Sequence, residues 1–117
     1  MKTIDVHAHI VPDSLWKAVE AKRPWHGYCH EHGEGHGTMV SSDGQRTSFS
    51  SPKVRFSVEE RLADMDAQNV DVQVLSLHSP FVGYHLGAAE GLALARDVND
   101  EIGRTVRDNP ARLAGLA

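Results

Sequence analysis

Residues 4–10 read IDVHAHI, an apolar stretch that carries two histidines, His7 and His9, spaced two positions apart. In a β-strand, side chains alternate between the two faces with a period of two. We therefore expect Asp5, His7 and His9 to share one face and the aliphatic residues to share the other. Same-face residues lie about 6.6 Å apart along a strand, a gap that two imidazoles can close to hold one ion at roughly 2.1 Å. The stretch predicts a first strand that carries two metal ligands.

The histidine pair lies at the C-terminal end of this expected strand, because Pro12 follows it and stops the strand. In parallel α/β folds, ligands and catalytic groups gather at that end. The alternative is that one or both histidines only line a polar opening of the fold. Asp5 also has two interpretations: it supports a ligand by accepting a hydrogen bond, or it satisfies backbone groups of the strand.

Composition narrows the class of protein. The chain has 117 residues with 40% hydrophobic content, enough for one small domain. A net charge of -4 and a pI near 6.0 give no electrostatic footprint for nucleic acid or an anionic membrane. Cys29 is the single cysteine, so no disulfide can form within one chain and a reducing compartment is the default. With no membrane-length apolar run and no secretory leader pattern, we expect a cytoplasmic protein.

The rest of the sequence alternates helix and strand patterns, which predicts right-handed crossovers and a parallel sheet. Ser57 and Glu60 have the spacing of a capping box. The last expected helix has an apolar face made of Leu92, Ala95, Val98, Ile102 and Val106. The expected elements are helices at 13–22, 57–68 and 88–109 and strands at 3–9, 71–78 and 112–117.

Residues 25–52 interrupt this alternation with a Gly-, Ser-, His- and Thr-rich composition, which predicts an inserted excursion outside the core. Within it, 38–41 and 46–50 can pair as a hairpin across an Asp-Gly turn. The histidines at 30, 32 and 36 lack the paired Cys-x-x-Cys spacing of a structural zinc site. We interpret the insertion as a flexible lid that carries substrate contacts, with adventitious metal binding as the alternative.

The expected strands pose a problem for a free-standing domain. Three parallel strands with apolar faces leave two open edges and an uncovered inner face, and the chain stops inside the last strand. We therefore expect the N-terminal part of a larger α/β barrel, about three β/α units of a (β/α)8 barrel that usually has about 250 residues. The alternative is a self-contained three-layer domain with a short sheet.

Three blocks in this order resemble the amidohydrolase-related family, most closely its aminocarboxymuconate-semialdehyde decarboxylase branch: IDVHAH at 4–9, RLADMDAQNVDVQVLS at 61–76 and NPARLAGL at 109–116. The resemblance implies a metal-dependent barrel that decarboxylates, or less often hydrolyses, small carboxylated ring or semialdehyde compounds. It implies that His7 and His9 bind one divalent metal, commonly zinc and sometimes manganese. The family's other ligands, a histidine and an aspartate from later strands, have no counterpart here, so we expect the chain alone to be incomplete and inactive.

The resemblance also implies substrate contacts. It places a carboxylate-binding arginine in the inserted region, with Arg46 the better candidate and Arg55 the alternative, because a guanidinium fork matches a carboxylate. Phe81 and Tyr84 resemble an aromatic segment of the decarboxylases, or else they pack the rim of the barrel. His78, which ends the second strand of the barrel, lines the substrate or serves as a structural histidine.

The expected partners are a small carboxylated substrate, the C-terminal remainder of the barrel and a second copy of the chain, since family members are often dimers. Two other functions stay open. One is hydrolysis by the same metal on the same fold. The other is a non-catalytic module that binds metal through its histidine-rich loop or completes a partner chain.

Overall fold

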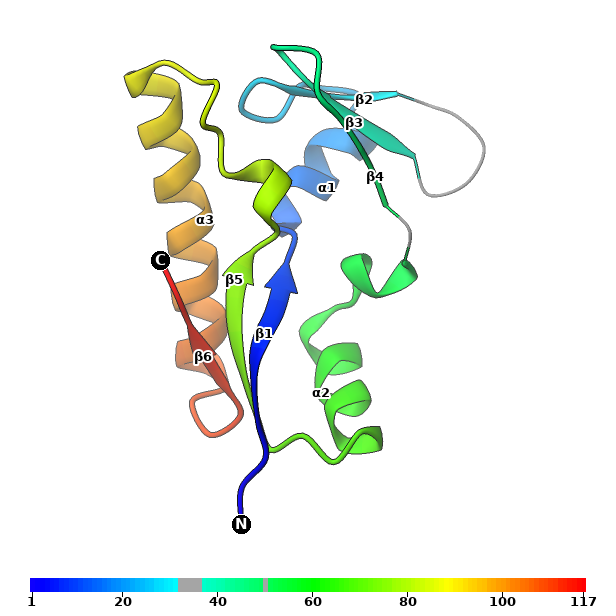
Figure 1. The fold of residues 1–117 in the computed structure, drawn as a ribbon, viewed down its shortest axis with the longest axis vertical. Helices are drawn as coiled ribbons and strands as arrows, with labels where there is room; N and C mark the ends of the chain where they lie inside the picture. Colours follow the sequence, from blue (N-terminus) through cyan, green and yellow to red (C-terminus); the bar gives the residue numbers. More distant parts are fainter. Residues whose placement is uncertain (32–36, 50) are drawn as a thin grey trace.

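The computed structural model describes residues 1–31, 37–49 and 51–117, and these form a mixed α/β fold (Figure 1). Within these ranges, one three-stranded sheet is parallel, with the order β1 (Ile4–Ile10), β5 (Val72–Leu77) and β6 (Leu113–Gly115). A second sheet is antiparallel and contains β2 (Tyr28–Glu31), β3 (Thr38–Ser41) and β4 (Arg46–Ser48). Figure 1 shows the antiparallel sheet beyond the C-terminal ends of β1 and β5. The predicted parallel sheet is confirmed.

The helices also lie close to their predicted bounds. They are α1 (Asp13–Glu20), α2 (Val58–Ala67) and α3 (Ala88–Asp108), with short 3-10 turns η1 (Pro52–Arg55) and η2 (Ser79–Phe81). The capping box of α2 is present, because the Glu60 amide donates to Ser57 Oγ at 3.2 Å and the Ser57 amide donates to Glu60 Oε2 at 2.8 Å. These reciprocal bonds satisfy two amides at the start of the helix and fix where it begins.

The N-terminus of α1 has no side-chain cap from its N-cap residue, Pro12, and is instead contacted by helix α3. The Asp13 amide donates to Glu101 Oε1 of α3 at 2.7 Å, and Ser14 Oγ donates to Asp97 Oδ2 at 2.9 Å. A carboxylate at a helix N-terminus satisfies a free amide and interacts favourably with the helix dipole. Burial raises the pKa of Glu101. Two acidic residues of α3 therefore fix the first turn of α1.

The core extends into the region that the sequence analysis placed outside it. Trp25, Tyr28, Met39 and Phe49 all lie in the larger hydrophobic cluster, with side chains of α1 and α3. The phenol of Tyr28 donates to the carbonyl oxygen of Pro80 at 2.9 Å, which ties the antiparallel sheet to the loop after β5. The prediction of an excursion outside the core is wrong, because its few large apolar side chains all turn inward and pack on the helices.

The predicted hairpin is confirmed. Strands β3 and β4 pair antiparallel, with Thr38 opposite Ser48 and Val40 opposite Arg46. Gly44 has a φ of +91° in the connecting turn, a conformation that glycine adopts without strain. Strand β2 joins this hairpin as a third strand, which the sequence analysis did not predict. Most of the histidine-rich segment, residues 32–36, lies outside the described residues.

The buried face of α3 agrees with the prediction at Val98, Ile102 and Val106 and differs from it at 92–95. Leu94, Val98 and Ile102 are buried, whereas Leu92 is 52% exposed and Ala95 is also exposed. Residues four apart share a helix face, so 94, 98 and 102 form one row against the core. Leu92 precedes this row by two positions and is turned toward solvent. The prediction chose the wrong positions within 92–95, because this apolar stretch offers a side chain to either of two adjacent rows of the helix.

Candidate active site

The first strand contains a β-bulge that includes His7, the first histidine of the pair. Asp5 lies opposite Gln73 and Ala8 lies opposite Leu75, so residues 6 and 7 of β1 lie opposite the single residue 74 of β5. Such a two-against-one pairing inserts an extra residue and breaks the alternation of faces. Gln73 and Leu75 share a face because they are two apart, and therefore Asp5 and Ala8 share it too. Ala8 and Leu75 are buried in the cluster that includes Met65 of α2, which identifies this as the helix-facing side.

Asp5 therefore lies on the face opposite to His9. The prediction that Asp5, His7 and His9 share a face is wrong for Asp5, because strict alternation cannot include the extra residue. Asp5 still supports the site from behind, since its Oδ1 accepts a hydrogen bond from the His7 amide at 3.0 Å. Of the two interpretations of Asp5, the structure shows the second, in which Asp5 satisfies a backbone group of the strand. That group is the amide of His7, which is itself a predicted ligand.

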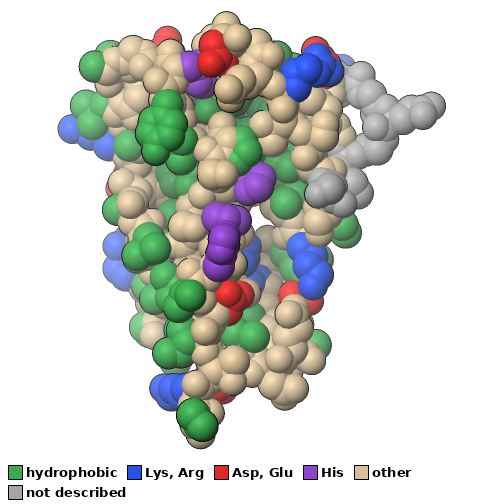
Figure 2. Space-filling model, in the orientation of Figure 1, with side chains coloured by type: hydrophobic (Ala, Val, Ile, Leu, Met, Phe, Trp, Pro, Cys, Tyr) green, Lys and Arg blue, Asp and Glu red, His purple; other side chains and the backbone are tan. Residues whose placement is uncertain are grey.

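His7 and His9 converge on the other face of the sheet. Both side chains are exposed, and their Nε2 atoms lie 3.0 Å apart, with the rings nearly perpendicular. The Nδ1 atom of His9 lies 3.1 Å from Ser76 Oγ on β5, which orients the ring. Figure 2 shows histidine side chains gathered at the centre of the visible face. A distance of 3.0 Å between two ring nitrogens is that of a hydrogen bond, in which one imidazole donates and the other accepts.

His78 lies beside the pair. Its ring centroid is 5.5 Å from that of His9, and burial, followed by the charge of His9, lowers the pKa of His78. A lowered pKa favours the neutral imidazole at neutral pH. Among the residues that the structure describes, no three His, Cys, Asp or Glu side chains are grouped to hold one ion. The described site therefore consists of two converging imidazoles and a third one nearby.

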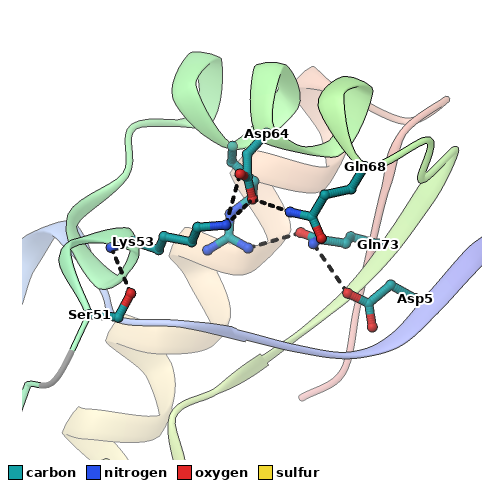
Figure 3. Close-up of polar contacts among 7 residues, drawn as sticks. Asp5, Ser51, Lys53, Asp64, Gln68 and Gln73 are labelled. Carbon is teal, nitrogen blue, oxygen red and sulfur yellow. Dashed lines mark hydrogen bonds and ion pairs between the residues drawn. The ribbon is translucent and has the colours of Figure 1, made fainter.

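A polar network lies behind the pair, on the helix-facing side of the sheet. The Arg61 guanidinium of α2 donates to the carbonyl oxygen of His9 at 3.0 Å and to Gln73 Oε1 at 2.9 Å. Gln73 in turn donates to Asp5 Oδ2 at 3.3 Å, and Figure 3 shows these two side chains facing each other. The sequence analysis missed Arg61 and Gln73. A usable signal was the polar Gln73 within an otherwise apolar strand.

The predicted carboxylate-binding arginines both have partners within the chain. Arg46 on β4 forms a two-pronged ion pair with Glu31, with Nη1 2.9 Å from Oε1. The hydrogen bond from Arg46 lowers the pKa of Glu31. Arg55 lies over the ring of Trp16, 4.3 Å from its centroid. Arg46 thus shows the predicted geometry toward a carboxylate, but the carboxylate is one of the protein's own.

The two predicted aromatic contacts have opposite environments. Phe81 is fully buried, with Trp25, Tyr28 and Phe49 around its ring. The structure shows the packing that the sequence left open as its alternative, and the role of Phe81 as a substrate contact stays a prediction. Tyr84 is 95% exposed in the loop before α3, so its predicted role stays a prediction.

Two solved structures that share this fold are described as amidohydrolases. A Staphylococcus aureus protein assigned as an amidohydrolase superimposes with a TM-score of 0.59 at 21% identity, over 100% of this chain and 28% of the other. An amidohydrolase II protein gives a TM-score of 0.60 at 22% identity, over 99% of this chain and 31% of the other. At these identities the likeness concerns the fold, and it covers a small part of each neighbour.

Curated relatives point to one branch of this class. The chain is 33% identical over 116 residues to a 2-amino-3-carboxymuconate-6-semialdehyde decarboxylase of Caenorhabditis elegans, covering 98% of this chain and 28% of the relative. It is 29% identical over 114 residues to the protein of the same name from Dictyostelium discoideum, covering 97% of this chain and 31% of the relative. The predicted resemblance to the amidohydrolase-related family is thus confirmed. The chain spans about three tenths of the length of these relatives, and no family model matches it.

The helices were also compared with the length and hydropathy that a membrane span requires. In the described part of the chain, none is both long enough and apolar enough to cross a bilayer.

Proposed function

We propose that this chain forms part of a (β/α)8 barrel of a metal-dependent decarboxylase, in which His7 and His9 bind one divalent ion. The observation that carries the proposal is the 3.0 Å approach of their two Nε2 atoms on an exposed face of the parallel sheet. Zinc is the first candidate and manganese the second, because imidazole nitrogen suits zinc and is also accepted by other divalent metals. The parallel sheet of β1, β5 and β6 would supply about three units of that barrel.

The residues fit a metal ion in donor type and direction, although two imidazoles are fewer than the three protein ligands of a catalytic zinc. The C-terminal remainder of a barrel is the proposed source of the missing ligands, and without it we expect no activity. A bound divalent ion would polarise a substrate oxygen or lower the pKa of a water molecule. His9 is oriented for this task by Ser76.

The proposed substrate is a small carboxylated ring or semialdehyde compound. The relatives' names support this class, because they describe a decarboxylase of a carboxylated semialdehyde. Arg46 would bind the carboxylate if Glu31 released it, with Arg55 as the alternative, and His78 and Tyr84 would line the substrate. Hydrolysis by the same metal is the second candidate chemistry, since the structural neighbours are amidohydrolases. The antiparallel sheet would cover the active-site end, and a second copy of the chain is a further proposed partner.

Metal analysis of the native assembly tests this proposal. The protein is purified with whatever polypeptide accompanies it, and intact mass and metal content are measured on the same sample. We expect about one ion per assembly, its loss in His7→Ala and His9→Ala, and release of carbon dioxide from a carboxylated semialdehyde by the wild type alone. His26→Ala is the matched control. The Nε2 atom of His26 lies 2.8 Å from Asp97 Oδ2 and not beside the His7 and His9 pair, so this variant should leave the metal content unchanged.

Two results would overturn parts of the proposal. Metal that survives in the double variant of His7 and His9 would be bound elsewhere, as the non-catalytic module with a histidine-rich loop requires. Cleavage of an amide or lactone by the assembly, with no carbon dioxide released from any carboxylated compound, would replace decarboxylation by hydrolysis.

A further inference from the structure

The approach of His7 and His9 depends on the backbone of β1. On a regular strand, same-face side chains start about 6.6 Å apart. In this strand, the bulge at 6–7 includes His7 itself, and a bulge bends the strand and re-aims the side chains at it. A bulge also leaves backbone groups without partners in the sheet. Whatever satisfies those groups therefore controls how the two imidazoles point.

The polar network behind the sheet reaches the backbone of both histidines. Arg61 donates to the carbonyl oxygen of His9, and Asp5, held by Gln73, accepts from the amide of His7. The carbonyl of Ile10 accepts from the amide of His78, the residue after β5, so the preceding carbonyl of His9 points away from that strand. Arg61 donates to this carbonyl from the helix-facing side of the sheet.

We propose that Arg61 is a positioning residue that fixes the bulge of β1 through His9 and, by way of Gln73 and Asp5, through His7, and so directs the two imidazoles toward each other. Its relevance to metal binding rests on the proposed function, whereas its effect on the geometry of the pair does not.

The environment of Arg61 suits this role. The side chain is half-buried, and its planar guanidinium can hold two acceptors in fixed directions, which a lysine cannot. Asp64, one turn further along α2, is the neighbouring carboxylate, but it accepts from Lys53 at 2.9 Å and from Gln68 at 2.7 Å (Figure 3). With Asp64 bonded to other donors, the Arg61 guanidinium is directed to His9 and Gln73.

The experiment compares two arginines that both hold backbone carbonyls. Arg61→Met removes the network behind the pair. Arg112→Met is the matched control, because Arg112 donates to the carbonyl oxygens of Val70 and Asp71 and to Asp66, at the opposite end of β5. Each variant is made in the full chain. Co²⁺ affinity is measured on the native assembly, and unfolding in urea and amide hydrogen exchange are measured on the metal-free protein. The ring nitrogens of His7 and His9 are followed by NMR in the same samples.

We expect Arg61→Met to weaken Co²⁺ binding by about 10–100-fold, as removal of groups that orient metal ligands typically does. In the metal-free protein it should speed exchange of the His7 amide and shift the nitrogen signals of both rings. Arg112→Met should lower stability without either change. Arg61→Lys should recover part of the affinity, because it keeps one donor.

Three outcomes would overturn the proposal. The first is unchanged hydrogen exchange of the His7 amide together with unchanged ring-nitrogen signals in Arg61→Met. The second is an equal loss of Co²⁺ affinity in both arginine variants. The third applies if Arg61→Met does not fold, and it is hydrogen exchange and ring signals like those of the wild type in Gln73→Leu. A native assembly that binds no Co²⁺ at His7 and His9 would instead overturn the proposed function. The metal-free NMR comparison would still decide whether Arg61 positions the pair.

Discussion

Burial of side chains in the two sheets of this protein is the opposite of what the composition of each sheet predicts. The antiparallel sheet comes from the least aliphatic part of the chain, yet Met39 and Tyr28 in it are only 1% and 3% exposed. Strand β1 of the parallel sheet is among the most apolar segments, yet Ile4 and Val6 are 55% and 73% exposed. The difference shows that apolar content alone does not locate the buried residues of this chain, which spans about three tenths of the length of its curated relatives. The packing of a few large side chains against α1 and α3 does.

The strongest test of this contrast is removal of the ring at the junction of the two sheets. Phe81→Ala should lower the free energy of unfolding by about 3–5 kcal/mol, because it leaves a cavity among buried aromatic rings. The matched variant is Tyr84→Ala, three residues later and almost fully exposed, which should change stability by no more than about 0.5 kcal/mol. Urea unfolding of both variants gives the comparison. Similar losses in the two would mean that the junction is not part of the core.

A smaller effect is expected from the hydrogen bond that ties the antiparallel sheet to the loop after β5. Tyr28→Phe removes the donor to the Pro80 carbonyl and should cost about 0.5–1.5 kcal/mol at neutral pH. Burial raises the pKa of the Tyr28 hydroxyl, so its stabilising contribution is complete below the unfolded pKa of about 10. That contribution is lost as the pH rises through the higher folded pKa.

The pH dependence provides its own control. Wild type should lose stability relative to Tyr28→Phe above about pH 10, and the two proteins should run parallel from pH 6 to 9. Urea unfolding at several pH values measures this difference. If the free energy of unfolding of the wild type instead rose relative to that of Tyr28→Phe above pH 10, the raised pKa of Tyr28 would be contradicted.

The smallest effect is expected on the exposed part of β1. Val6→Thr keeps a β-branched side chain and should alter the free energy of unfolding by less than about 0.5 kcal/mol, because Val6 is mostly in solvent. Ala8→Thr is the matched change two residues later on a buried site, and it should destabilise clearly through overpacking. If the Val6 variant were the more damaging of the two, this part of β1 would be buried in solution by a partner.

Much of the fold could be predicted from local patterns. The periods of α2 and β5, the capping box at Ser57 and the Asp-Gly turn before Gln45 depend on neighbours in sequence, and these predictions are confirmed. The phase of α3 could not be fixed, because the apolar positions at 92–95 fit two adjacent faces. The burial of Phe81 depends on rings more than thirty residues away, which no local pattern contains.

The site was predictable in part for a similar reason. The spacing of His7 and His9 predicted that they lie close together, and the structure brings them together. The orientation of Asp5 does not follow from spacing, because a single extra residue in β1 reverses the face of everything before it. The roles of Arg61 and Gln73 depend on that same bulge, so a regular strand gave no reason to connect them with the histidines.

The shared first turn of α1 has a consequence for the order in which the chain folds. Its two fixing contacts come from residues 88 and 83 positions away, and the helix has eight residues. An isolated helix of this length is unstable in water, because nucleation costs more than so few bonds return. Although α1 leaves the ribosome early, its first turn gains its partners only when α3 has been made and has docked. The second element of the chain is thus among the last to become stable.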